Sequence, residues 1–386
     1  MPRLDRDLRL LSAANLLYGL GIGLYLQLLF VYAMDLGASR ATIGVLNAVM
    51  LACIAAGNIP GAWAAQHFRL KTVIVVVWWL PVAAAVCFAL APSWQWLVPG
   101  LILSGLAMAN NPAFKSYITL HSEPERVARN ITLVFASYPA GLVVAPLAGG
   151  FIADRHGMHA VFWLSAVLYA ASSMAATLIG HIPSQEHRAP LRPAVVRENR
   201  GFRRYVAFFL AGFLAVYVGQ AFLTPYLSVV HGQGYGALGV YAALTALGTA
   251  LLTPVSGRIA DLRGTRAGAA VVLSLMCAGT LLLLGGGSPY AWAVAMFLCG
   301  GYDTFRFLAT GVVGRSFGDI PLAWGFALFD TMMGIPMAGG AVLGGVLFRA
   351  DAALPLVLVV AIAGGLLVVL AAWRERGERG RPDRGT

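Results

Sequence analysis

The segment GRIADLRGTRA, residues 257–267, is a short charged break between two long apolar runs. The segment GAWAAQHFRLK, residues 61–71, lies in the same position between two earlier runs, and it starts 196 positions before the first. Glycine pairs with nearly the same spacing are Gly105 with Gly300 and Gly149 with Gly344, each 195 positions apart. This spacing is about half of the 386 residues. We infer that six apolar runs occur twice, in the same orientation because six is even.

The composition places these runs in a membrane. Hydrophobic residues make up 59% of the chain and charged residues 11%, whereas a soluble protein carries about 25% charged residues. The runs reach the roughly 20 residues that cross a bilayer as a helix. They do not alternate polar with apolar residues, which excludes a membrane barrel. We therefore expect an all-α membrane protein.

Twelve transmembrane helices in two six-helix bundles are expected. The predicted helices span residues 8–34, 40–66, 72–91, 95–120, 123–153, 158–181, 204–230, 236–260, 266–286, 289–316, 320–348 and 352–373. The predicted domains are an N-terminal bundle (1–181), a cytoplasmic linker (182–203), a C-terminal bundle (204–373) and a basic cytoplasmic tail (374–386). The linker is polar, basic and proline-bearing, which is typical of a connection outside the membrane.

The positive charges predict the orientation. Of the 27 Lys and Arg residues, nearly all fall at the termini, in the linker or in turns on one side, and the opposite side holds Arg40, Arg155 and Arg349. Cytoplasmic loops of membrane proteins carry such an excess. We therefore expect a multi-pass protein of the cell inner membrane with both termini cytoplasmic. The same placement explains the net charge of +11 without a nucleic-acid partner.

Enzyme and metal chemistry find no support in the sequence. The four cysteines lie within predicted helices and have no metal-ligand spacing. We find no histidine cluster, nucleophile elbow or phosphate loop, and GLGIG at residues 19–23 lies inside a membrane helix with no preceding strand. We expect no cofactor, no metal and no catalytic residues.

Three charges lie near the middle of predicted helices. With a rise of about 1.5 Å per residue, Asp303 falls within ~2 Å of the midplane, and Arg306 and Asp330 fall ~6 Å toward the cytoplasm. A charge at a helix centre costs roughly 2.5–3.5 kcal/mol, so these groups must pair or contact water. One interpretation is a structural Asp330–Arg306 ion pair. The other is a titratable site, in which Asp303 or Asp330 takes a proton. Arg306 then tunes the pKa of that acid or holds an anionic group.

Polar and aromatic residues form stripes beside these charges. The residues predicted to line a substrate cavity are Tyr25, Asn110, Asn111, Tyr217 and Gln220. The alternative is hydrogen bonding between helices, which is common in membranes. Lys115 lies farther from the middle of its helix, and we expect it to extend to the cytoplasmic surface. Aromatic groups around a polar centre suit an amphipathic organic solute better than a bare ion.

GRIADLRGTR resembles the signature that the major facilitator superfamily of secondary transporters carries between helices 8 and 9. The first-half copy departs from it, because Ala65 occupies the position of the acid. GLVVAPLAGG, residues 141–150, is similar to the helix 5 motif of bacterial exporters in this family. The resemblance implies two bundles that rock around a mid-membrane cavity lined by helices 1, 4, 7 and 10.

The resemblance also implies a conformational lock. In the family, the acid of the signature loop contacts the opposite bundle on the cytoplasmic side. The residues expected in this lock are Gly257, Asp261, Gly264, Arg266, Arg126 and Arg129. The alternative is that Asp261 pairs with Arg258 or Arg266 within its own loop.

The predicted function is proton-coupled efflux of a small amphipathic organic molecule by an antiporter that alternates its access. The alternatives are an importer or exchanger of an anionic metabolite, with Arg306 as the anion's partner, and a lipid or lysolipid carrier. The expected partners are the substrate, protons and membrane lipids, and we expect a monomer.

The topology can be tested by cysteine labelling. A cysteine introduced at Ala38 or Gly285 should react with an impermeant thiol reagent added outside intact cells, because both positions fall on the extracytoplasmic side. A cysteine at Arg192 should not react, because the linker is cytoplasmic. Labelling of Arg192→Cys from outside would contradict the two-bundle topology.

Overall fold

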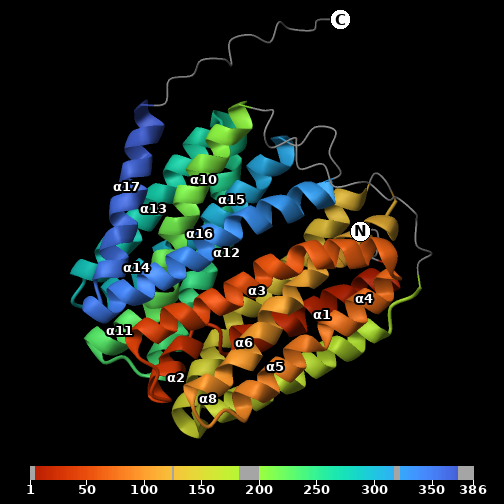
Figure 1. Ribbon diagram of the computed structural model, residues 1–386, viewed down its shortest axis with the longest axis horizontal. Coiled ribbons are helices and arrows are strands. Elements are labelled where there is room, and N and C mark those ends of the chain that lie inside the picture. The colour runs from red at the N-terminus through yellow and green to blue at the C-terminus, as the bar shows by residue number, and fades with distance from the viewer. Residues whose placement is uncertain (1–4, 124–125, 182–199, 317–321, 373–386) are drawn as a thin grey trace, which may run out of the picture.

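The computed structural model is a bundle of helices, and the residues that it describes contain no strand (Figure 1). The described residues are 5–123, 126–181, 200–316 and 322–372. Most of the predicted linker and the whole predicted tail lie outside them.

The helices of the two halves follow the apolar runs. Those of the N-terminal half are α1 (Arg6–Gly23), α2 (Leu29–Asp35), α3 (Arg40–His67), α4 (Leu70–Trp78), α5 (Leu80–Ala89), η1 (Trp94–Trp96), α6 (Leu97–Leu106), η2 (Ala107–Asn110), α7 (Asn111–Leu120) and α8 (Val127–Thr177). Those of the C-terminal half are α10 (Arg200–Gly219), η4 (Gln220–Phe222), α11 (Leu223–His231), α12 (Tyr235–Arg263), α13 (Thr265–Gly285), α14 (Pro289–Cys299), α15 (Gly301–Ser316), α16 (Leu322–Ala350) and α17 (Leu354–Ala372).

Nine segments among the described residues are long and apolar enough to cross a membrane. One of them, Arg129–Thr177, has 49 residues, which is about 73 Å of helix at 1.5 Å per residue. A bilayer core is only about 30 Å thick. Within it, Gly157 has a φ of 76° and joins two helices at a sharp turn. Glycine adopts this left-handed conformation without the penalty of a Cβ atom.

Several long helices are interrupted near their middles. Residues 24–28 separate α1 from α2, a 3-10 segment separates α6 from α7, and another separates α10 from α11. The break between α14 and α15 is at Gly300, whose carbonyl accepts hydrogen bonds of 3.1 Å from the Thr249 and Thr304 hydroxyls. The same carbonyl accepts the Thr304 N–H at 3.2 Å, so the two hydroxyls add to a backbone hydrogen bond that continues across the break.

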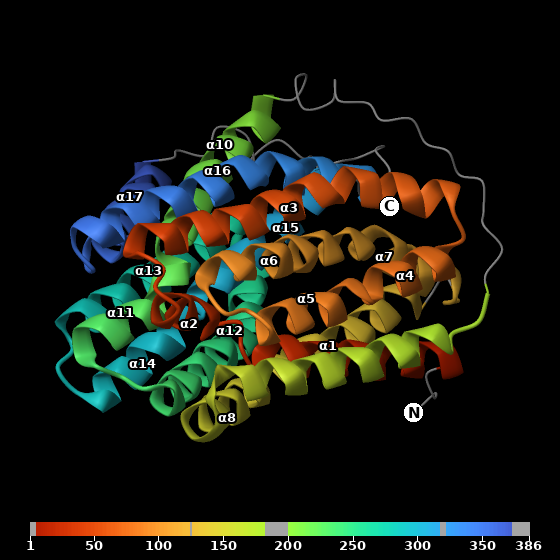
Figure 2. The same cartoon turned by 60° about the horizontal axis from the view of Figure 1, so that its bottom comes forward.

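The helices of each half pack mainly on one another. In the first half α1 and α5 lie against α8, and α3 lies against α6. In the second half α10 lies against α16 and α17, and α13 lies against α14 and α17. The two halves meet where α3 lies beside α16 and where α8 lies beside α12 (Figures 1 and 2).

Both of these contacts between the halves contain glycine on glycine. Gly44 of α3 meets Gly345 of α16, and Gly150 of α8 meets Gly239 of α12. A Cβ atom at any of the four would lie 2.3–2.6 Å from a backbone oxygen of the partner helix. The two contacts correspond, because Gly44 and Gly239 are 195 positions apart and so are Gly150 and Gly345. Both contacts lie at the same end of the molecule. We call it the sealed end.

A polar cluster ties the start of α1 to the far end of the N-terminal half. The buried Asp7 carboxylate accepts hydrogen bonds from the Tyr117 hydroxyl (2.7 Å) and the Gly180 N–H (2.6 Å). His121 bonds to Asp5 beside it. The Arg6 backbone N–H and then His121 hold the pKa of Asp5 below its usual value.

This cluster predicts a stability effect. Asp7→Leu leaves the Gly180 N–H without its acceptor, which should cost about 1–3 kcal/mol, whereas the Tyr117 hydroxyl can still donate to the Gly180 carbonyl at 3.0 Å. Tyr117→Phe removes one donor and leaves the other bond, so its cost should be smaller. Thermal denaturation of the purified protein in detergent measures both. A melting temperature of Asp7→Leu at or above that of Tyr117→Phe would contradict the role given to this carboxylate.

Candidate functional site

The mid-helix charges meet where α15 begins. Asp303 lies in the first turn of α15, where the partial positive charge of a helix start favours a carboxylate. Gln220, from η4, donates a hydrogen bond of 3.1 Å to its Oδ1 atom. The Arg306 Nη2 atom lies 3.8 Å from the same oxygen, one helical turn further on. An acid, a base and an amide therefore form one cluster.

The charge cluster, Asp303, Arg306 and Gln220, is only partly covered by protein. The exposed fractions of the Arg306 and Asp303 side chains are 45% and 30%. These positions are near the middle of the run from Pro289 to Ser316. The charges therefore lie at mid-bundle depth with part of their surface uncovered.

Tyrosines from both halves surround Arg306. Tyr217 of α10 and Tyr138 of α8 both lie within electrostatic range of Arg306 and Asp303. The Tyr217 ring also stacks on Phe213, with centroids 6.2 Å apart. Tyr217 is a predicted site residue, whereas sequence reasoning missed Tyr138. The signal was available, since Tyr138 is the aromatic residue directly before Pro139 in the helix that carries the exporter-like motif.

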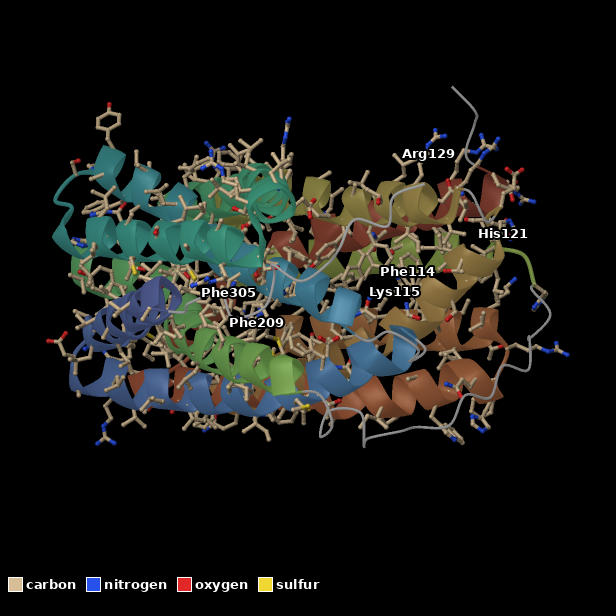
Figure 3. The ribbon with its side chains drawn as sticks, turned by 90° about the horizontal axis from the view of Figure 1, so that it is seen from above. Phe114, Lys115, His121, Arg129, Phe209 and Phe305 are labelled. Atoms are coloured by element: carbon tan, nitrogen blue, oxygen red, sulfur yellow. The ribbon has the colours of Figure 1, made fainter. Side chains whose placement is uncertain are left out.

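The second acid, Asp330, faces the other half of the molecule. It is exposed, and it lies within electrostatic range of Lys115 and Arg306. Lys115, expected at the cytoplasmic surface, is instead half-buried on α7 and interacts with Asp330. Figure 3 shows Lys115 and Phe114 on one side of the middle of the molecule, and Phe209 and Phe305 on the other. Lys115 comes from the N-terminal half, whereas Asp303, Arg306 and Asp330 come from the C-terminal half.

A pocket lined by both polar and apolar side chains lies inside the N-terminal half, with an empty volume of about 390 Å³ that includes open solvent. Its lining includes Asn15, Asn110, Asn111, Tyr18, Trp78 and Phe114. Asn15 donates a hydrogen bond of 3.0 Å to the Val134 carbonyl. The Asn110 Oδ1 atom is buried and has no hydrogen-bond partner among the described residues. The two predicted asparagines therefore line this pocket together.

Tyr25 lies in the core of the N-terminal half in this conformation. Its side chain is 2% exposed, and its ring packs on Phe88 and Phe162. Its hydroxyl lies 3.1 Å from that of Tyr169. The structure thus places Tyr25 in an aromatic cluster and not at the charge cluster.

The predicted lock residues lie at the end opposite the sealed end. Arg126 forms an ion pair of 3.1 Å with Glu123, and the side chain of Arg266 donates to the Leu370 carbonyl at 2.6 Å. Asp261 is exposed near the end of α12. A Cβ atom added at Gly257 or at Gly264 would meet no other atom within 4 Å. Gly264 has a φ of 88°. The lock belongs to a conformation closed at this end, so it stays a prediction.

The chemistry available to these groups is binding and proton exchange. Among the described residues, no group of three or more His, Cys, Asp or Glu side chains could hold a metal ion. Carboxylates can exchange protons with water in the cavity. Guanidinium, amide and phenol groups can hold a polar solute by hydrogen bonds and aromatic stacking.

Comparison with known proteins gives relatives over most of the chain. The purine ribonucleoside efflux pump NepI of Escherichia coli O127:H6 (strain E2348/69 / EPEC) is 25% identical over 309 residues, which cover 77% of this chain and 72% of that protein. The MFS-type transporter ppzB of Metarhizium rileyi (strain RCEF 4871) is 32% identical over 114 residues, or 29% of this chain and 24% of that one.

Solved structures share the fold. The crystal structure of the nucleoside transporter NupG has a TM-score of 0.77 at 14% identity, and the match covers 95% of this chain and 98% of that one. The human organic anion transporter MFSD10 (TETRAN) has a TM-score of 0.67 at 16% identity, with 96% and 100% covered. The profile of the Major Facilitator Superfamily matches residues 11–317. This chain therefore belongs to the Major Facilitator Superfamily and is a multi-pass membrane transporter, not an enzyme.

Proposed function

We propose that this transporter exports a small amphipathic organic solute in exchange for protons, and that the solute is a nucleoside. The observation that carries the proposal is the partly exposed charge cluster of Asp303, Arg306 and Gln220 in the middle of an apolar bundle. The relatives named for nucleoside transport and purine ribonucleoside efflux support the substrate class. A nucleoside combines a flat heteroaromatic base with sugar hydroxyls, which matches tyrosines beside an amide and an ion pair.

We infer twelve membrane crossings in two six-helix bundles, 1–181 and 204–373, joined by the linker 182–203. Nine segments are long and apolar enough to cross, and the one that turns at Gly157 crosses twice. Two further crossings are α1 with α2 and α14 with α15. The two matched glycine contacts support the repeat. Both termini and the basic tail 374–386 are cytoplasmic, and the protein works as a monomer in the inner membrane.

In the proposed cycle, Asp303 carries the proton. When Asp303 is ionised, its carboxylate, beside Arg306 and Gln220, accepts hydrogen bonds from the hydroxyls of the solute. When it is protonated, the carboxyl becomes a weaker acceptor and the solute leaves. Proton and solute thereby compete for the same carboxylate, which is the requirement for exchange. The cavity alternates its opening between the two membrane faces as the bundles rock.

An anionic metabolite is the second candidate substrate. The observation that favours it is the pair of cations in the interior, Arg306 and Lys115, one from each half. A guanidinium pairs with a carboxylate or phosphate in a bidentate manner. Asp303 and Asp330 oppose this, since they neutralise both cations in the absence of substrate. We therefore place the nucleoside first.

Asp303→Asn tests the coupling. Asparagine keeps an acceptor for Gln220 but cannot carry a charge or exchange a proton. Nucleoside flux driven by a pH gradient in proteoliposomes should fall about tenfold or more, while nucleoside counterflow without a gradient should persist. Asp330→Asn is the comparison, and Asp351→Asn, at an exposed loop acid, is the control. Full gradient-driven flux in both the Asp303 and the Asp330 variants would show that these acids are structural.

Arg306→Gln separates the two substrate classes. Glutamine can still donate a hydrogen bond to an uncharged solute, so nucleoside export should change only severalfold, by about 1 kcal/mol of binding. An anion would lose its charge partner, and its transport should disappear. The measurement is the transport of a panel of nucleosides and organic anions in the same proteoliposomes, with the parent protein and with the variant. Transport of anions alone, abolished in the variant, would overturn the nucleoside proposal.

A further inference from the structure

The two glycine contacts of the sealed end have different polar surroundings. At the α8–α12 contact, the Asp154 carboxylate of α8 accepts a hydrogen bond of 2.8 Å from the Gly236 N–H. Gly236 is the second residue of α12, where a helix leaves its first N–H groups unpaired. The residue before the helix, Gly234, supplies no side-chain cap. An acid from the other half of the molecule thus caps α12.

A second acid of the N-terminal half holds the same helix start. The Tyr235 hydroxyl donates a hydrogen bond to the Asp35 carboxylate, which ends α2. The neighbouring cation on α8, Arg155, lies over the Phe151 ring of its own helix, 4.2 Å from the centroid. Together, Asp154 and Asp35 attach the first two residues of α12 to the N-terminal half.

The corresponding contact between α3 and α16 lacks such an acid. At the positions 195 residues after Asp154 and 195 before Tyr235 stand Arg349 and Arg40. The start of α3 is capped within its own half, by the Ser39 hydroxyl on the Thr42 N–H at 3.2 Å. Arg40 lies 5.8 Å from the centroid of the Phe348 ring. The two glycine contacts match in backbone geometry, but within the described part of the chain a carboxylate cap from the opposite half is found at the α8–α12 contact alone.

We propose that Asp154 is the latch of the sealed end, and that its release from the start of α12 is required for this end to open. The proposal rests on the alternating access of the proposed function. A carboxylate on a helix start combines a charge-assisted hydrogen bond with an attraction to the helix dipole. Removal of the latch shifts the balance toward the open conformation by about tenfold, since caps and charge-assisted bonds contribute on this scale.

The experiment measures a distance across the sealed end. Spin labels are attached to cysteines at Gln95 and at Tyr290, two exposed positions on opposite halves. The native cysteines, Cys53, Cys87, Cys277 and Cys299, are replaced by Ala or Ser. In nanodiscs, double electron–electron resonance should show a larger share of the longer distance for Asp154→Ala than for the parent protein. Asp154→Asn keeps an oxygen that accepts from Gly236, so it should restore most of the shorter distance.

A matched control uses a cap of the same chemistry within one half. Asp351, also an exposed acid at the sealed end, accepts the Ala353 N–H at 2.7 Å in its own turn. Asp351→Ala should therefore leave the distance distribution unchanged. An Asp154→Ala distribution equal to that of the parent, or an equal shift in Asp351→Ala, overturns the latch.

The same contact can be broken from the other half. A Cβ atom at Gly236 would lie 2.3 Å from the Asp154 carboxylate, so Gly236→Ala should displace it and lengthen the distance as Asp154→Ala does. Gly287→Ala is its control, because a Cβ at Gly287 meets open space. An unchanged distribution in Gly236→Ala overturns the latch even where Asp154→Ala fails to fold. If the distance distribution shifts in these variants but the parent protein transports no nucleoside, the latch is supported and the proposed substrate is refuted.

Discussion

The contact between Arg306 and Asp303 imposes a requirement on everything around it. Two charges in the middle of an apolar bundle must be paired or in contact with water, since each costs roughly 2.5–3.5 kcal/mol at a helix centre. Their separation of 3.8 Å is longer than a tight ion pair, but Arg306 also lies near Tyr217 and Tyr138 and 5.3 Å from the centroid of the Phe307 ring. Protein groups from both halves thus help to meet the requirement, and the uncovered part of both side chains leaves room for water.

Small residues allow the two halves to approach closely at one end of the molecule. Helices without side chains at the crossing approach until backbones touch, which excludes water without any specific chemistry. Such a seal gains little from charge and can separate without leaving a buried polar group behind. The carboxylate contacts at the start of α12 are exposed, so their release also costs no desolvation.

The sequence predicted the membrane fold well because hydropathy and charge placement act over whole runs. It predicted that Asp303 and Arg306 share a helix face, since a spacing of three residues fixes this within one helix. It could not predict the surroundings of Lys115. The four residues of η2 turn about 20° more per residue than an α-helix, so α7 is rotated by about 80° from the face that an unbroken helix would present. Tyr138 and Asp154 were missed because their partners lie on helices far away in the sequence.

The matched glycine contacts have a consequence for the origin of the protein. If the two halves are copies, Gly44 and Gly150 stand for one patch, and Gly239 and Gly345 stand for the same patch on the other copy. The first glycine of one patch (Gly44) then contacts the second glycine of the other patch (Gly345), and Gly150 contacts Gly239 in the same way. This two-fold arrangement is the pattern of an isologous homodimer interface. A six-helix ancestor could have associated with itself through these same surfaces. On this interpretation, the carboxylate at position 154 and the arginine at position 349 are equivalent positions at which the two copies differ.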